Sequence, residues 1–128
     1  MSWDRPAAVA GLAVVCEPVV DAGATFLSAP PGSINPPAIL AQYPTTVTLH
    51  SPTFGVDIVD WSITAVVGLD SGEQLDALLG LVTDCVQGDP TLDAAVQIAT
   101  PTEWRNWRIL GVSGADYLAA DLVLSVRM

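Results

Sequence analysis

The strongest structural pattern in the chain is an alternation of apolar and polar side chains within residues 56–68. Asp60, Ser62 and Thr64 alternate with a set of apolar residues, namely Val59, Trp61, Ile63, Ala65 and Val67. Successive side chains of a β-strand point to opposite faces of a sheet, so this pattern predicts a strand with one face in the core. The polar face is expected to be partly solvated or to lie against a neighbour.

A second alternating segment ends the chain and predicts a long final strand. One face of it carries Asp121, Ser125 and Arg127, and the other face is apolar, with Leu118, Ala120, Leu122, Leu124 and Val126. Shorter segments rich in strand-forming residues, bounded by turn residues, predict further strands. These segments lie at 24–28, 38–42, 45–50, 95–99 and 107–112.

Two segments have the apolar spacing of amphipathic helices. The first follows Asp4 and is disrupted near its end by Pro18, and the second runs over 71–87 and stops at Gly88. Helices and strands in this order predict an α+β fold, with two helices packed on one face of a mostly antiparallel sheet. The expected order of elements is α-β-β-β-β-α-β-β.

The composition narrows the classes of protein further. The chain has 128 residues with no linker-like segment, which predicts a single domain, 1–128. Fourteen acidic residues outnumber four basic residues, all of them arginine, for a net charge of −10. Binding to nucleic acid phosphates needs clustered cations, so this class of function is excluded. No apolar run reaches the roughly 18–20 residues of a membrane span, and no association with a membrane is expected.

Sequence patterns of catalysis and metal binding are missing. His50 is the single histidine, and it stands in a strand-like context without a nucleophile pattern around it. The segment 68–72 lacks the lysine of a phosphate-binding loop. Cys16 and Cys85 have no CxxC partners, so they are expected to be small core residues in a reducing compartment, with a disulfide as the alternative. We therefore expect no enzyme activity, no cofactor and no metal.

Two segments are candidates for a protein interface. Trp104, Arg105, Trp107 and Arg108 place two aromatic and two cationic side chains within five residues, the types that protein–protein hot spots favour. The alternative is a strand whose tryptophans cover the core edge while its arginines pair with nearby acids. The second candidate is the loop at 29–37, which is either surface chain or a docking element. Its prolines are Pro30, Pro31, Pro36 and Pro37.

Apolar side chains on both faces of several strands favour self-assembly, because a chain of this size has limited interior in which to bury them. A homo-oligomer buries the excess, and a ring is one closed solution.

The sequence resembles the tail terminator proteins of siphophages. The centre of that family is similar to residues 56–68, which read VDIVDWSITAVVG, followed by Ser71 and the segment DALL at 76–79. Residues 114–124, which read GADYLAADLVL, are similar to the family's last strand. The absence of lysine and the usage of Ala, Val, Asp and Arg are similar to proteins of phages that infect GC-rich actinobacteria.

This resemblance implies a structural virion protein, made in the bacterial host cytoplasm and located in the tail or neck. The expected assembly is a homohexameric ring that stops polymerisation of the tail tube and joins the tail to the head connector, or stopper, protein. DNA is expected to pass through the ring without specific binding, and an acidic lumen suits this passage. The alternatives are another neck or tail ring component, such as a head-closure or tail-tube protein, and a small ligand-binding or enzymatic α+β domain.

Overall fold

The two segments with alternating side chains form the centre of a six-stranded sheet. The computed structural model describes residues 3–28, 34–49 and 57–127. In it, β4 (Ile58–Gly68) pairs antiparallel with β6 (Ala115–Arg127) along its whole length. The apolar sets of the two strands face the same side, because residues directly opposite each other in a ladder share a face.

The remaining strands extend the sheet on both sides of this central pair. They are β1 (Thr25–Leu27), β2 (Ala38–Ala41), β3 (Thr46–Thr48) and β5 (Ile98–Val112). The strand order is β1-β2-β4-β6-β5, and β3 pairs with the first residues of β4. Only the pairing of β1 with β2 is parallel. The prediction of a mostly antiparallel α+β fold is confirmed.

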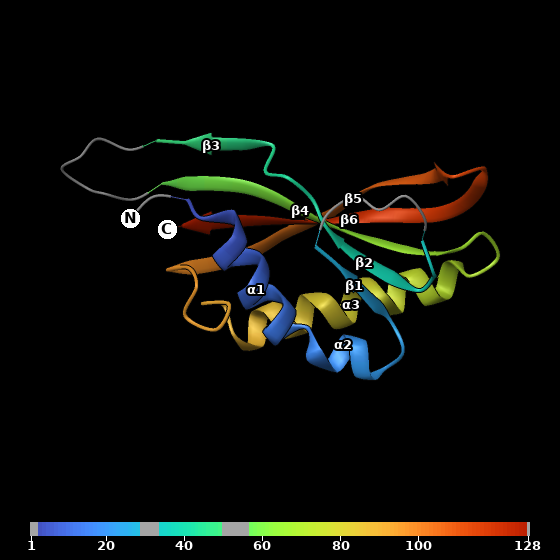
Figure 1. Ribbon diagram of the computed structural model, residues 1–128, viewed down its shortest axis with the longest axis horizontal. Coiled ribbons are helices and arrows are strands. Elements are labelled where there is room, and N and C mark those ends of the chain that lie inside the picture. Colours follow the sequence, from blue (N-terminus) through green and yellow to red (C-terminus); the bar gives the residue numbers. More distant parts are fainter. Residues whose placement is uncertain (1–2, 29–33, 50–56, 128) are drawn as a thin grey trace.

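All helices in the described part of the chain lie on one face of the sheet, as Figure 1 shows. They are α1 (Arg5–Val15), α2 (Glu17–Asp21) and α3 (Gly72–Gly88). The main core fills the space between them and the sheet, and Trp61 is its largest fully buried side chain. Trp61 donates a hydrogen bond from its ring nitrogen to the carbonyl of Gln42, so the indole is buried without an unsatisfied donor.

The first predicted helix is divided in two, so the described residues form three helices where the sequence predicted two. The break falls at Cys16, between α1 and α2. Pro18 has no backbone N–H, and its ring clashes with the carbonyl four residues earlier, so one continuous helix cannot pass this position. Pro18 instead occupies the first turn of α2, where a proline is tolerated.

The chain after α3 also differs from the prediction. Separate strands were expected at 95–99 and 107–112, whereas β5 runs without interruption over Ile98–Val112. Two register shifts against β6, one between Pro101 and Glu103 and one between Arg105 and Arg108, allow this continuous pairing. Each shift is a β-bulge, in which one strand has an extra residue and the regular alternation of faces is lost.

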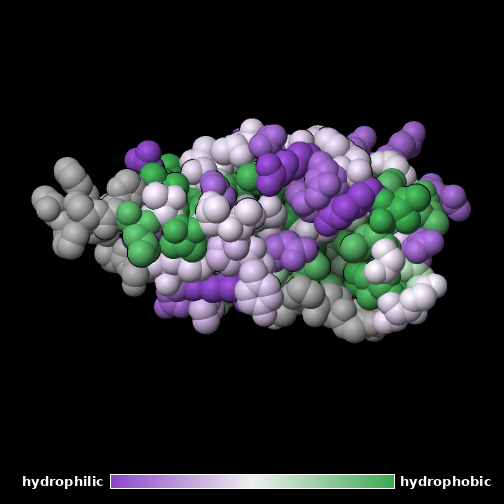
Figure 2. Space-filling model, turned by 90° about the horizontal axis from the view of Figure 1, so that it is seen from above, coloured by the Kyte–Doolittle hydropathy of each residue, from purple (hydrophilic) through white to green (hydrophobic). Residues whose placement is uncertain are grey.

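The opposite face of the sheet has no helix in the described part of the chain. Figure 2 shows this face, with hydrophilic side chains gathered near its middle and hydrophobic surface towards its right-hand end. A small second cluster of buried residues belongs to this face: Ile34, Ala38, Val66 and Ala119. Tyr117 packs against this cluster and donates its hydroxyl to the carbonyl of Ile34 at 3.1 Å.

Candidate functional site

β5 forms one end of the sheet and presents most of its side chains to solvent. It is 15 residues long and pairs with β6 on one side only. Three apolar side chains between residues 104 and 109 are exposed: Trp104 by 39%, Trp107 by 53% and Ile109 by 67%. An exposed edge strand offers unpaired backbone groups to another chain, so β5 is the candidate interaction surface.

The first part of this edge, residues 98–107, carries features that oppose pairing with another strand. We call it the bulged half of β5. Pro101 has no N–H to donate, both bulges distort the edge, and Glu103 and Arg105 add charge. Asn106 has a positive φ of 66°, which asparagine tolerates better than most residues. These features are the ones by which natural sheets prevent uncontrolled association.

The second part of the edge, residues 108–112, lacks these features, and we call it the regular half of β5. Its pairing with β6 is uninterrupted from Arg108 to Val112, with neither a bulge nor a proline. After Arg108 the sequence is Ile-Leu-Gly-Val, without a charged side chain. The regular half is therefore the part of β5 that is able to accept a further strand.

The two tryptophans of the predicted interface lie in the bulged half. Trp104 pairs with Leu122, a core residue, and therefore lies on the helical face of the sheet. Its ring nitrogen donates to Oγ1 of Thr83 on α3 at 2.9 Å, which fixes the indole across the groove between α3 and β5. Trp107 lies between the two residues of the second register shift and is more exposed.

The two arginines of the predicted interface have different surroundings. Arg105 forms only a loose pair with Glu103, with 3.8 Å between Nη1 and Oε1 and both side chains about half exposed. Arg108 donates from Nη1 to Oδ1 of Asp121 at 3.2 Å and to the carbonyl of Asn106 at 2.9 Å. Arg105 is thus available to a partner, whereas Arg108 stabilises the bulge.

Asp121 is the centre of a polar network on the helix-free face. Its Oδ1 accepts from the Thr64 hydroxyl at 2.7 Å as well as from Arg108, and its Oδ2 accepts from Asn106 at 3.2 Å. Gln42 donates to Oγ1 of Thr64 at 3.0 Å. Thr64 is fully buried and Asp121 is 8% exposed, so the network satisfies polar groups that burial otherwise makes costly.

The sequence analysis did not predict this network, although the positions of two of its residues indicate part of it. Thr64 and Asp121 both stand on the polar faces of the alternating strands, and the ladder places them directly opposite each other. The positions of Asn106 and Arg108 depend on the bulge, which changes the face that each following residue occupies. A signal for that bulge is hard to read from the sequence alone.

The described residues of the second predicted interface lie near the other end of the sheet. Pro36 and Pro37 are half-buried, are joined by a cis peptide bond, and directly precede β2. Pro30 and Pro31 lie outside the described residues. The structure therefore places Pro36 and Pro37 beside β1 and away from the four residues on β5.

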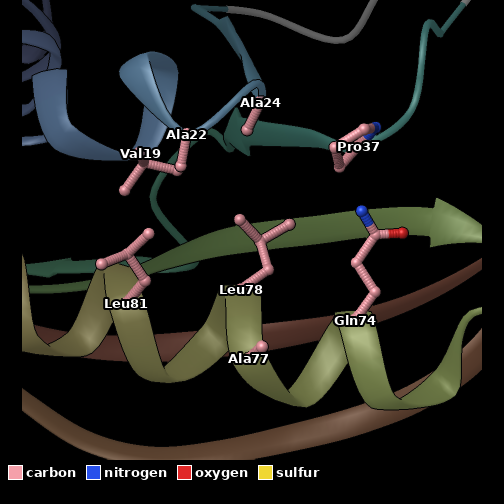
Figure 3. Close-up of a pocket in the computed structure, with 8 residues that line it drawn as sticks. All are labelled: Val19, Ala22, Ala24, Pro37, Gln74, Ala77, Leu78 and Leu81. Atoms are coloured by element: carbon pink, nitrogen blue, oxygen red, sulfur yellow. The ribbon is translucent and has the colours of Figure 1, made fainter.

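An apolar groove of about 170 Å³ lies beside β1, between α2 and α3. In Figure 3, side chains from α2 and from the starts of β1 and β2 face side chains of α3 across it. Among the described residues, Gln74 is the one polar side chain of its lining, which otherwise consists of Val19, Ala22, Ala24, Pro37, Ala77, Leu78 and Leu81. A cavity of about 150 Å³ takes up a benzene molecule, so this groove has room for one apolar side chain.

The two cysteines are free thiols. Burial, and secondarily the nearby Cys85 thiol, raise the pKa of Cys16 from its usual 9.0 to about 12. Burial, and secondarily Asp84, also raise the pKa of Cys85. A raised pKa keeps a thiol protonated and unreactive at neutral pH, which suits packing and not nucleophilic catalysis.

Within residues 3–28, 34–49 and 57–127, no group of three or more potential metal ligands occurs. His50, the predicted strand-end histidine, lies outside the described residues. No helix in this part of the chain is long and apolar enough to cross a membrane.

A comparison with protein-family models gave no match, and a comparison with curated proteins gave none either.

Proposed function

We propose that this protein is a tail terminator: a structural virion protein that forms a homohexameric ring at the end of a long phage tail. In this function the ring stops polymerisation of the tail tube protein and joins the tail to the head connector protein. The proposal rests on the resemblance of residues 56–68 and 114–124 to that family. The structural observation that carries it is β5, an exposed strand that offers one end of the sheet to another chain.

A structural role is supported by the placement of the polar and apolar side chains in the fold. The polar network around Asp121 is internally satisfied, and the groove beside β1 has an apolar lining. An enzyme or a metabolite-binding domain needs convergent polar groups in a cleft. The exposed Trp104, Trp107 and Ile109 instead supply apolar surface of the kind that association buries.

The architecture favours a terminator over a tail-tube protein. A tube protein is expected to have a long loop and hairpins that close a β-barrel. Here an open sheet is crossed by α3, a helix of 17 residues. The net charge of −10 suits a ring through which DNA passes, because acidic walls repel phosphate.

Electron microscopy of particles assembled without this protein tests the proposal. Overlong tails without heads are the expected result, because nothing then stops tube polymerisation. Full-length tails of normal number joined to heads would overturn the proposal. Heads without any tail would instead assign the protein to the connector side of the neck.

Variants in the bulged half of β5 test whether this surface contacts the head or the tube. The double variant Trp107→Ala/Arg105→Ala is suitable because both side chains are exposed and Arg105 has only a loose partner. We expect this variant to fold normally and to give tails that do not join heads. Arg108 is a poorer choice, because its removal disturbs the Asp121 network. Val14→Ala, at an exposed apolar position on α1, is the control and should leave the titre of infectious particles unchanged.

A further inference from the structure

The two ends of the sheet are unlike, and both are free in the described part of the chain. One end is β5, and the other is β1, which pairs only with β2. β1 has three residues and lies parallel to its neighbour, whereas β5 has fifteen and lies antiparallel. A contact between the β5 end of one copy and the β1 end of the next uses different surfaces on the two copies. Such a contact repeats from copy to copy and closes into a ring when the rotation allows it.

The most exposed apolar residue of β5 points to the face that carries the helices. Ile109 stands opposite Leu118 in β6, and Leu118 stands opposite Val67 in β4. Val67 belongs to the core beneath the helices, so all three side chains lie on that face of the sheet. The side chain of Ile109 is 67% exposed, in the regular half of β5.

The groove between α2 and α3 is on the same face, at the opposite end of the sheet. Ala24 and Pro37, which precede β1 and β2, form its sheet side, and Leu78 and Ala77 form its helix side (Figure 3). If β5 of one copy continues the sheet beside β1 of the next, Ile109 arrives on the helical face next to this groove. The groove has the volume and the apolar lining for one such side chain.

The charges at the two ends are complementary. β5 carries two of the four arginines of the chain, and Arg105 is exposed with only a loose internal partner. α2 leads directly into β1 and carries Glu17 and Asp21, both exposed, without a basic residue. Arg105 stands opposite Asp121 in the ladder and lies on the helix-free face, whereas α2 covers the other face, so these charges favour the approach of the two ends without forming a direct pair.

We infer that neighbouring copies join end to end, with the regular half of β5 in one copy against β1 of the next and with Ile109 in the groove between α2 and α3. The occupant of the groove is therefore a second copy of this chain. This inference rests on the proposed function in one respect only, which is that the row of joined copies closes into a ring. The contact itself follows from the two free strands, the groove and the charges.

Two single variants, each defective in one side of the contact, test the inference. Ile109→Glu places a charge on the β5 side, and Ala77→Trp fills the groove on the other side. Each variant alone should lose self-association by about 30-fold or more, as expected for a central interface residue. Mixed in equal amounts, they should form a dimer and nothing larger, because the β5 side of the Ala77→Trp chain and the groove of the Ile109→Glu chain are both intact.

Sedimentation of each chain and of the mixture gives the readout. Ile98→Glu is the matched control: it is the same substitution on the same strand, at an exposed position in the bulged half. It should associate like the wild type. Circular dichroism and urea unfolding of all chains separate a lost contact from a lost fold, and both tested positions are exposed.

The possible outcomes separate the contact from the function. An Ala77→Trp chain that assembles like the wild type overturns the inference, since a contact between two β5 strands does not need the groove. A wild-type chain that stays monomeric at the highest concentration also overturns it. In either case the micrographs of particles lacking the protein still decide the proposed function.

Discussion

Gly11 and Leu92 lie in such close contact that a Cβ atom on residue 11 would stand 2.0 Å from the Leu92 carbonyl oxygen. Leu92 is fully buried in the turn between α3 and β5, and it has a positive φ of 48°. The neighbouring atom is backbone and cannot rotate away. α1 is therefore pressed directly against the turn that leads into β5, and only glycine permits this contact.

The substitution Gly11→Ala should lower the free energy of unfolding by about 2 kcal/mol or more, because overpacking against backbone forces the helix or the turn to move. Urea unfolding measures the change. Gly80→Ala is the matched control, since a Cβ there would meet no atom within 4 Å beyond its chain neighbours and the backbone of its own helix. This change in the middle of α3 should stabilise the protein by about 0.5–1 kcal/mol, because alanine favours helix more than glycine does. Equal effects of the two substitutions would contradict the contact.

Arg108→Ala should destabilise the fold by about 2 kcal/mol, because it removes a charged donor from the nearly buried Asp121. Thr64 and Asn106 still donate to Asp121, so the loss is smaller than for a carboxylate left without partners. Arg105→Ala, which removes an exposed pair on the same strand, should change stability by less than about 0.5 kcal/mol. Urea midpoints of the two variants give the comparison, and similar midpoints would argue against a stabilising role for the network.

The stability of the protein should fall as the pH rises above about 9. The pKa of Cys16 is about 12 in the folded chain and 9.0 when unperturbed, so above pH 9 the unfolded chain holds fewer protons at this thiol. The stabilisation is therefore complete below pH 9 and is lost as the pH approaches 12. The slope reaches about 1.4 kcal/mol per pH unit. Cys16→Ala should flatten it, and an unchanged slope in that variant would assign the effect to other groups.

Both thiols should react slowly with alkylating reagents in the folded protein at pH 8. At that pH only about one Cys16 thiol in 10⁴ is ionised, given a pKa of about 12. Cys85 is half-buried and should be modified before Cys16. Mass spectrometry after timed alkylation gives the order, and urea should make the two rates similar. Faster modification of Cys16 in the folded chain would place it in a more exposed position than the structure does.

The central part of the fold was predictable because its sequence signal is local. The apolar and polar residues around Trp61 and Leu122 alternate strictly, and the apolar residues of α3 recur at helical spacing. The spacing of apolar residues in the sequence is therefore enough to predict these elements and the faces that they bury. The helix predicted over 71–87 is observed as Gly72–Gly88, and Ser71 precedes it as the N-cap residue without a capping hydrogen bond from its side chain.

The features that the sequence did not predict depend on interactions between segments far apart in the chain. The division between α1 and α2 reflects the missing N–H of Pro18, and the exact position of the break is set by packing around Cys16. The bulges of β5 appear only when it is aligned with β6. The interface prediction at 104–108 treated its four residues alike, whereas the ladder leaves Trp107 and Arg105 exposed and turns Arg108 to Asp121. No local pattern predicts the groove, because its walls come from three separate parts of the chain.

The unlike strands at the two ends of the sheet have a consequence for any assembly that uses both. Copies joined in this way all point in the same direction, so the assembly has a rotation axis but no dyad perpendicular to it. Its two rims are then chemically different, although every subunit has the same sequence. A single protein thereby acquires polarity, and under the proposed function a tail tube and a head would each meet a rim of their own.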